Sequence, residues 1–404
     1  MSMMTRLKRS NDLTHSVRGG MCAYKAQTLL TLIAWKASLE SLQTVLMLQI
    51  YRTSTGEWED AVTLHSIACR MVCSLGGHFY QATKYNAPSV SSVERQSWHT
   101  RILFWLSYIF DKDISLRSGQ PPLLTEEYCD LTPPESYTNR YDCQSGLSQD
   151  YNSENCTSDG FTPYFLGDLG LSYIKEKTCH LLYSPTAFKV DDTQLLLHIR
   201  HLDTELESWR ASIPMGYRPK LSIPPGCLIF DAAMSSWQRM KCFHLQLEYH
   251  CLMTAIHTTV RRCGAVYAEA PNLPDDLHSV FHSSSDLSLE ASRSTLALLK
   301  SHINVLEDEV FWRVAFYPFV AAMSLFMNIL IHPLDPQVQI DLEILASTIS
   351  IFQNVPVQAL TSDETEYIKE MNNFVTELVR LGNCALWKAR REEKEETGQP
   401  ASRS

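Results

Sequence analysis

The stretch Arg95–Pro134, RQSWHTRILFWLSYIFDKDISLRSGQPPLLTEEYCDLTPP, decides the fold. Apolar residues recur in it at the spacing of a helix, at Trp98, Ile102, Trp105 and Ile109. A second apolar line comes from Leu103, Leu106 and Phe110. The stretch therefore predicts a helix that is apolar nearly all round, which belongs in a protein interior. Gly119 and the pair Pro121–Pro122 end that helix and begin an extended acidic loop.

The same stretch resembles a known family. Its ordered residues are similar to the central signature of the fungal-specific transcription factor domain, the helical regulatory region of fungal zinc-cluster transcription factors. The matching residues are Arg101, Phe104, Trp105, Tyr108, Asp111, Lys112, Ser115, Leu116, Gly119, Pro121 and Pro122. Gln120 stands where the family usually has a basic residue. The resemblance implies that these residues have structural or regulatory roles.

Shorter matches follow the family's order along most of the chain. They are Ser38–Gln43, Leu75–His78, Leu206–Trp209 with Ile213–Pro214, Leu247–His250, and Phe316–Pro336. In the second match Gly77 replaces the usual leucine. The resemblance thus implies one regulatory domain over residues 23–388.

Hydrophobic periodicity outside the central stretch also indicates helices. The helical runs are Trp35–Ile50, Leu64–Leu75, Leu195–Trp209, Leu245–Ile256, Leu296–Val310 and Met371–Leu381. Gly76–Gly77 closes the second run as helix-ending glycines do. A further loop is expected around Pro271, Pro274 and Ser283–Ser285. With no alternating strand pattern, the sequence predicts an all-α fold, a single large multi-helix domain between a basic tail (1–22) and a charged tail (389–404).

Composition limits the function classes. A formal net charge of -10 over 404 residues argues against a broad electrostatic grip on nucleic acid. The twelve cysteines have no regular spacing and no secretory signal precedes them, so we expect reduced thiols inside the cell.

The acidic loop spans about residues 126–160, where eight acidic residues accompany one basic residue, Arg140. Loops of this length are unusual inside a compact domain. The composition fits a mobile insertion or an acidic contact surface for a partner.

Val314–Ile331 has eighteen residues without a charge, near the lower limit for a membrane span. Pro318, Ser324 and Asn328 interrupt it. The expectation is a core helix and no membrane.

A zinc binuclear cluster needs six thiolates with two Cys-x-x-Cys pairs. No two cysteines of this chain are separated by two residues. Cys69 and Cys73 stand four apart and are interpreted as core residues. We therefore expect no metal site and no specific DNA binding by this chain alone, the zinc module being either never present or lost from the gene model.

Two other groups formally resemble metal sites but are interpreted as solvated helix faces. They are His198 and His201 with Glu205, and His244 with Glu248. Neither has the His-Glu-x-x-His spacing, and no nucleophile elbow, phosphate loop or dinucleotide fingerprint occurs. The sequence predicts no catalytic residues and no cofactor.

Asp111, Lys112, Asp113 and Arg117 form a charged node where the central helix ends. Asp113 and Arg117 have the spacing of a favourable helix pair. The node fits a structural cap or ion pair, or the rim of a regulatory or ligand pocket.

The resemblance implies a nuclear transcriptional regulator or co-regulator of a metabolic or secondary-metabolite gene set. Without its own zinc cluster it is expected to act through the transcription machinery or a DNA-binding factor, with a small-molecule effector as a further possibility. The alternative is a helical small-molecule-binding protein or enzyme with no transcriptional role.

Overall fold

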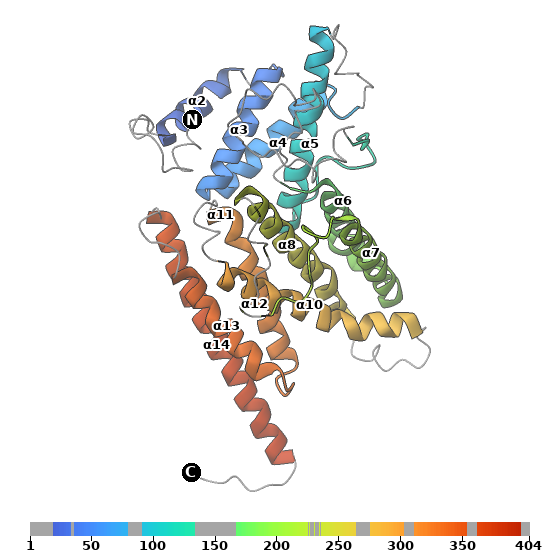
Figure 1. The fold of residues 1–404 in the computed structure, drawn as a ribbon, viewed down its shortest axis with the longest axis vertical. Coiled ribbons are helices and arrows are strands. Elements are labelled where there is room, and N and C mark those ends of the chain that lie inside the picture. Colours follow the sequence, from blue (N-terminus) through green and yellow to red (C-terminus); the bar gives the residue numbers. More distant parts are fainter. Residues whose placement is uncertain are drawn as a thin grey trace. The chain divides into compact units, whose positions relative to one another are not determined.

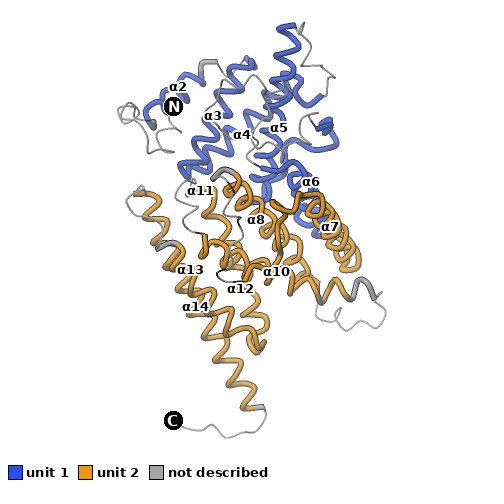
Figure 2. The backbone as a smooth tube through the Cα atoms, viewed as in Figure 1, with its two compact units in different colours: residues 1–188 blue, residues 189–404 orange. Residues whose placement is uncertain are grey.

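The computed structural model describes residues 19–33, 36–79, 91–133, 167–224, 236–263, 275–302, 311–353 and 362–396, with a few single residues between 226 and 234. These residues form helices and contain no strand, so the predicted all-α fold is confirmed (Figure 1). The chain divides into two compact units, residues 1–188 and 189–404 (Figure 2). The predicted domain bounds of 23 and 388 stay a prediction.

The described residues of the first unit include five α-helices and the segment that follows the fourth of them. The helices are α2 (Gly19–Ile33), α3 (Leu39–Thr55), α4 (Trp58–Ser74), α5 (Ser92–Ser118) and α6 (Leu169–Thr178). Neighbours along the chain pack together, and α5 also packs on α3. The ends of these helices carry recognisable signals. Ser38 caps α3, and Ser91 with Glu94 forms a complete capping box on α5.

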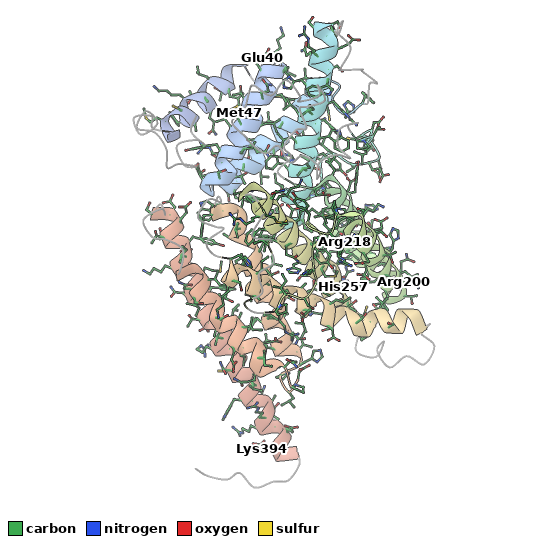
Figure 3. All side chains as sticks on the ribbon, in the orientation of Figure 1. Glu40, Met47, Arg200, Arg218, His257 and Lys394 are labelled. Atoms are coloured by element: carbon green, nitrogen blue, oxygen red, sulfur yellow. The ribbon has the colours of Figure 1, made fainter. Side chains whose placement is uncertain are left out.

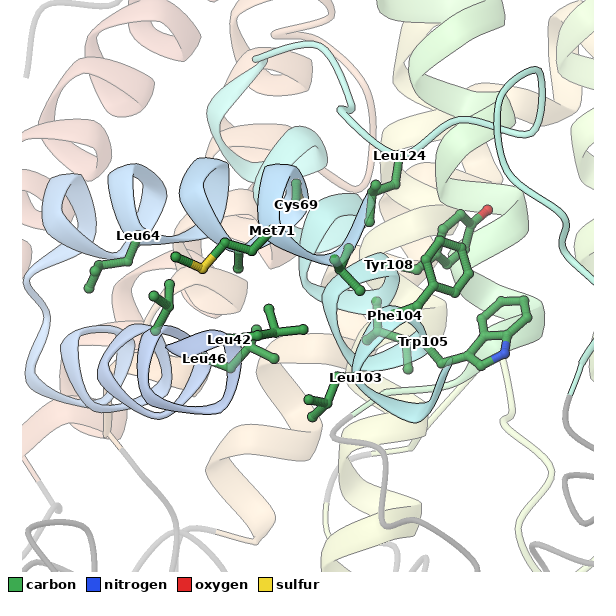
Figure 4. Packing of buried hydrophobic residues seen from close by; sticks show 14 of the residues in the cluster. Leu42, Leu46, Leu64, Cys69, Met71, Leu103, Phe104, Trp105, Tyr108 and Leu124 are labelled. Carbon is green, nitrogen blue, oxygen red and sulfur yellow. The ribbon is translucent and has the colours of Figure 1, made fainter. Parts of the chain in front are cut away.

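The core of this unit lies between α3, α4 and α5. Leu42, Leu46, Val72, Phe104 and Trp105 are all at most 2% exposed. Figure 4 shows the side chains of α3 and α4 facing each other beside the aromatic rings of α5. Leu124, from the segment after α5, points toward the same helix and is 1% exposed (Figure 4). The central helix is therefore buried as its apolar pattern predicts.

The second unit is built around α10. Among its described residues the α-helices are α7 (Asp192–Ser212), α8 (Ser236–His257), α10 (Asp275–Ser301), α11 (Phe311–Val314), α12 (Phe316–Ile331), α13 (Val338–Gln353) and α14 (Ser362–Glu396). α10 packs on α7, α8, α12 and α13, and α14 packs on α12 and α13.

The apolar stretch near residue 320 belongs to this second core. Within the described residues, Phe311–Ile331 is the one stretch long and apolar enough to cross a membrane, and 61% of an 18-residue segment of it is buried in the protein. Ala322, Leu325 and Ile329 are each at most 1% exposed. This packing agrees with the core helix that the sequence favoured.

The loop predicted at Ser283–Ser285 is wrong, because these residues lie inside α10. The hydroxyl of Ser283 donates to the carbonyl of Ser279 one turn earlier, at 2.8 Å. Ser284 is fully buried, with its hydroxyl 3.0 Å from Nδ1 of His257. Serine residues whose hydroxyls find such partners are compatible with a helix, although a run of serines is more typical of a loop.

The terminal tails and the acidic loop are described only in part. α2 includes residues 19–22, which were predicted as tail, and α14 continues to Glu396. Figure 3 marks Lys394 on these last turns, where residues 390–395 are all exposed. Of the acidic loop, residues 126–133 are described and form no helix, whereas residues 134–160 lie outside the described residues.

Candidate functional site

The family-like residues on α5 surround the chain segment that follows it. We call residues 120–133 the strap. The strap lies in the first unit together with α4, α5 and α6, which supply the side chains that hold it. Gly119, where α5 ends, has φ of +71°, a left-handed conformation that glycine adopts without strain, and its amide bonds the carbonyl of Ser115. Pro121 and Pro122 begin the strap directly after it.

Asp111 binds the start of the strap. Its carboxylate is 1% exposed and accepts the backbone amides of Leu123 and Leu124 at 3.0 Å. The same carboxylate lies 3.1 Å from Nε2 of His65 on α4 and 2.9 Å from Nζ of Lys112. A buried carboxylate is tolerated when its oxygens are satisfied in this way.

Lys112 is completely buried, and its ammonium group contacts two carboxylates. Nζ lies 2.9 Å from Asp111 and 3.0 Å from Oε2 of Glu176 on α6. It also donates to the carbonyl of Leu124 and lies 4.3 Å from the centre of the Tyr108 ring. The ammonium group therefore joins α5, α6 and the strap.

Glu176 and two tyrosines extend the network along the strap. The hydroxyl of Tyr108 donates to Oε2 of Glu176 at 2.6 Å, and the amide of Glu126 donates to Oε1 at 2.9 Å. The hydroxyl of Tyr173 donates to the carbonyl of Leu131 at 2.7 Å. Burial, together with the negative charge of Glu176, raises the pKa of Tyr108, so this hydroxyl stays a donor.

Arg101 holds the far end of the strap. Its guanidinium donates to the carbonyl of Gly77 at 2.9 Å, to that of Thr132 at 3.1 Å and to that of Asp130. It also lies over the rings of Phe104 and Trp105, at 4.6 and 5.0 Å from their centres. The Arg101 guanidinium therefore joins the residues just after α4 to the strap and packs on the aromatic rings of α5.

Trp105 is the packing centre of the site. Its ring is 0% exposed and meets Tyr108 and Tyr173 edge-on, at 5.6 and 6.3 Å between centroids. Such edge-to-face contacts are favourable arrangements for aromatic pairs. Trp105 and Tyr108 lie one turn apart on α5, as Figure 4 shows.

The local electrostatics favour an ionised Asp111. Burial alone would raise its pKa, but the hydrogen bond from His65 and the charge of Lys112, with the Leu123 amide, bring the pKa below its usual value. By contrast, burial and the nearby Asp111 raise the pKa of the Cys69 thiol well above its usual value. The arrangement is a buried polar network that fixes the strap, and the choice between the two roles predicted for the charged node stays a prediction.

Sequence reasoning missed several members of this site. His65, Tyr173, Lys175 and Glu176 were not singled out, because each sits within an ordinary helical pattern. Asp113 bonds Lys175 of α6, and its predicted pair with Arg117 stays a prediction. Of these residues, only His65 carried a signal in the sequence, because it is a polar residue among apolar neighbours.

The other candidate sites have different outcomes. His201 is exposed and lies 3.3 Å from Glu205, in agreement with the predicted solvated face. The prediction of a solvated face is wrong for His244 and Glu248, since every residue from 242 to 254 on α8 is buried. α8 packs on α7, α10 and α12, which leaves this stretch without an open side. Cys69 is buried and Cys73 half-buried, as expected for core residues.

Comparisons with known proteins give this geometry its context. The sequence profile of the fungal specific transcription factor domain matches residues 2–211, more than half of the chain. Two similar proteins are described as ABC-transporter-regulating transcription factors, from Aspergillus fumigatus and Aspergillus oryzae. Each is 27% identical over 365 residues, which cover 88% of this chain and 37% of the relative.

A third relative is an uncharacterized transcriptional regulatory protein of Schizosaccharomyces pombe. It is 22% identical over 316 residues, which cover 74% of this chain and 42% of the relative. The chain thus spans well under half the length of the curated relatives it matches, and no solved structure matches it. Because the profile match covers more than half of the chain, including α5 and the whole strap, the chain belongs to the fungal-specific transcription factor domain family.

Proposed function

We propose that this chain acts in the nucleus and controls a metabolic or secondary-metabolite gene set through a protein partner. The observation that carries the proposal is the match to a transcription factor domain across the strap and the helices that hold it. In that domain the family-like side chains of α5 fix the strap on the first helical unit. A fixed surface of this kind suits a module that binds other proteins better than an enzyme that turns over a substrate.

The partner is proposed because of the chain's charge and cysteines. Its 404 residues carry a net charge of -10 and no Cys-x-x-Cys pair. Sequence-specific contact with DNA needs clustered basic residues or a dedicated module. A DNA-binding factor or a component of the transcription machinery is therefore the proposed partner.

The proposed contact is the acidic sequence between residues 134 and 160. It contains Glu135, Asp142, Asp150, Glu154 and Asp159 against one basic residue. A partner surface rich in Lys and Arg would complement it. Since residues 123–132 are bonded to α5 and α6, a deletion confined to 134–160 leaves the strap intact.

The test is deletion of the gene, followed by transcript profiling under conditions where the gene is expressed. Because two relatives are described as regulating ABC transporters, transcripts for such transporters are the first to compare. We expect a defined gene set to change, and full-length protein to restore it. Unchanged transcripts throughout would refute the regulatory proposal.

Restoring the deletion strain with a protein that lacks residues 134–160 tests the contact separately. We expect the protein to accumulate in the nucleus and to leave the transcripts unrestored. The matched control removes the exposed residues 390–395 from the end of α14. Full rescue by the form lacking 134–160 would reject the acidic contact and retain the regulatory role.

The alternative function is a helical small-molecule-binding protein or enzyme. A nuclear protein whose deletion alters a gene set favours the regulator, whereas a cytoplasmic protein with measurable substrate turnover favours the alternative.

A further inference from the structure

Three potential metal-ligand atoms meet in the core of the first unit. His65 and Cys69 lie one turn apart on α4, and Asp111 approaches from α5. Nε2 of His65 is 3.1 Å from Oδ1 of Asp111 and 3.2 Å from Sγ of Cys69. The three ligand atoms all lie within 4.8 Å of one another, and the residues are 1%, 4% and 1% exposed.

The ligand types and spacings suit a zinc-like ion. Imidazole nitrogen, thiolate sulfur and carboxylate oxygen are the ligands that zinc takes in proteins. With metal–ligand bonds of about 2.0–2.3 Å, the ligand atoms of a tetrahedral site stand roughly 3.3–3.7 Å apart. The separations of 3.1 and 3.2 Å from Nε2 of His65 need a small expansion to admit an ion, and the third separation, between Asp111 and Cys69, is at most 4.8 Å.

The charges around the cluster also accommodate a cation. Asp111 and Glu176 supply two negative charges, and Lys112, which contacts both, supplies one positive charge. A divalent ion bound through the Cys69 thiolate adds one net positive charge, which brings this group to zero. Lys112 contacts Oδ2 of Asp111, while Oδ1 lies 3.1 Å from Nε2 of His65 and also accepts the backbone amide of Leu123.

We propose that His65, Cys69 and Asp111 bind one divalent cation of the zinc class. The ion joins α4 to α5 through Asp111, the same residue that binds the strap. Its binding therefore stabilises the first unit. This site uses residues unrelated to a six-cysteine cluster. The proposal is independent of the transcriptional role, since it is measured on the purified chain.

The experiment titrates metal-free protein with Co²⁺, which replaces zinc and gives a thiolate charge-transfer absorption. The two exposed cysteines of the described chain, Cys22 and Cys384, are first changed to Ser to remove surface thiols. We expect one Co²⁺ per chain with the charge-transfer band of a thiolate ligand, displacement by Zn²⁺, and a higher melting temperature with either metal. A chain that shows neither absorption nor metal-dependent melting overturns the proposal.

Variants assign the site. Cys69→Ser keeps the size of the side chain and is expected to abolish the charge-transfer band. The matched control is Cys179→Ser, another buried thiol of the same unit, which should keep it. His65→Gln should weaken binding at least tenfold. Bands that persist in Cys69→Ser, or vanish equally in Cys179→Ser, would show that the ion binds elsewhere.

Discussion

Oδ2 of Asp111 lies 3.0 Å from the backbone nitrogen of Leu124, thirteen residues further along the chain. This contact makes one carboxylate on a buried helix the anchor of the strap that follows it. The side chain of Leu124 is then held in the core, 1% exposed, with its carbonyl bonded to Lys112. The first predictions test this anchor.

Replacing Asp111 with Asn should destabilise the protein by about 3–5 kcal/mol, since it removes one of the two carboxylates that pair with the buried Lys112. The measurement is urea unfolding in the presence of a chelator, so that metal binding does not contribute. The matched control is Asp130→Asn, an exposed residue of the strap, which should change stability by less than about 0.5 kcal/mol. Equal effects of the two changes would contradict the anchor.

The same carboxylate should make stability depend on acid pH. Its folded pKa lies below the unfolded value of about 3.9, so its contribution is present above that value and lost as the pH falls through the folded pKa. Unfolding measured from pH 6 to pH 3 should therefore be less steep with pH in Asp111→Asn than in the wild type. Parallel curves would show that Asp111 does not carry the dependence.

Amide exchange tests the strap directly. In the wild type the amides of Leu123 and Leu124 donate to Asp111 and should exchange slowly. We expect Asp111→Asn to accelerate exchange at these amides. Exchange at Ser172, bonded within the α6 start, serves as the internal control. Uniform acceleration at both places would indicate global destabilisation in place of strap release.

Trp105→Ala should cost about 3–5 kcal/mol of unfolding free energy, the usual cost of deleting a large buried aromatic side chain. Trp105 is 0% exposed and contacts Tyr108 and Tyr173. His201→Ala, on an exposed face of α7, should change stability by less than about 0.5 kcal/mol. Small and equal shifts in melting temperature would refute the inferred packing.

Gly77→Ala should destabilise the first unit by about 1–3 kcal/mol. A methyl group there would lie 2.8 Å from Cγ2 of Val72 and 3.1 Å from the backbone oxygen of Thr100. The neighbour Gly76 is the control, because its φ of +78° makes alanine costly while no atom lies within 4 Å. In a double-mutant cycle, Gly77→Ala should cost less in the Val72→Ala background than in the wild type, whereas Gly76→Ala should cost the same in both. An equal reduction for both glycines would contradict the steric explanation.

Local patterns in the sequence determined α5 and the family. Trp98, Ile102, Trp105 and Ile109 predict α5 because helical periodicity needs only neighbours along the chain. The ordered residues from Arg101 to Pro122 indicated the domain, because a family motif also depends only on residues close together in the sequence. Local composition misled at Ser283–Ser285, where the hydroxyls find partners within and beside α10.

Only the tertiary structure decided which polar groups meet. His65 reaches Asp111 across 46 residues, and Tyr108 reaches Glu176 across 68. Periodicity shows which face of a helix is buried, but it does not show which turn of another helix lies opposite a given carboxylate. The strap anchor, the role of Arg101 and the His65–Cys69–Asp111 cluster therefore follow from packing, because each joins side chains that are distant in sequence and meet only when the helices close on a common core.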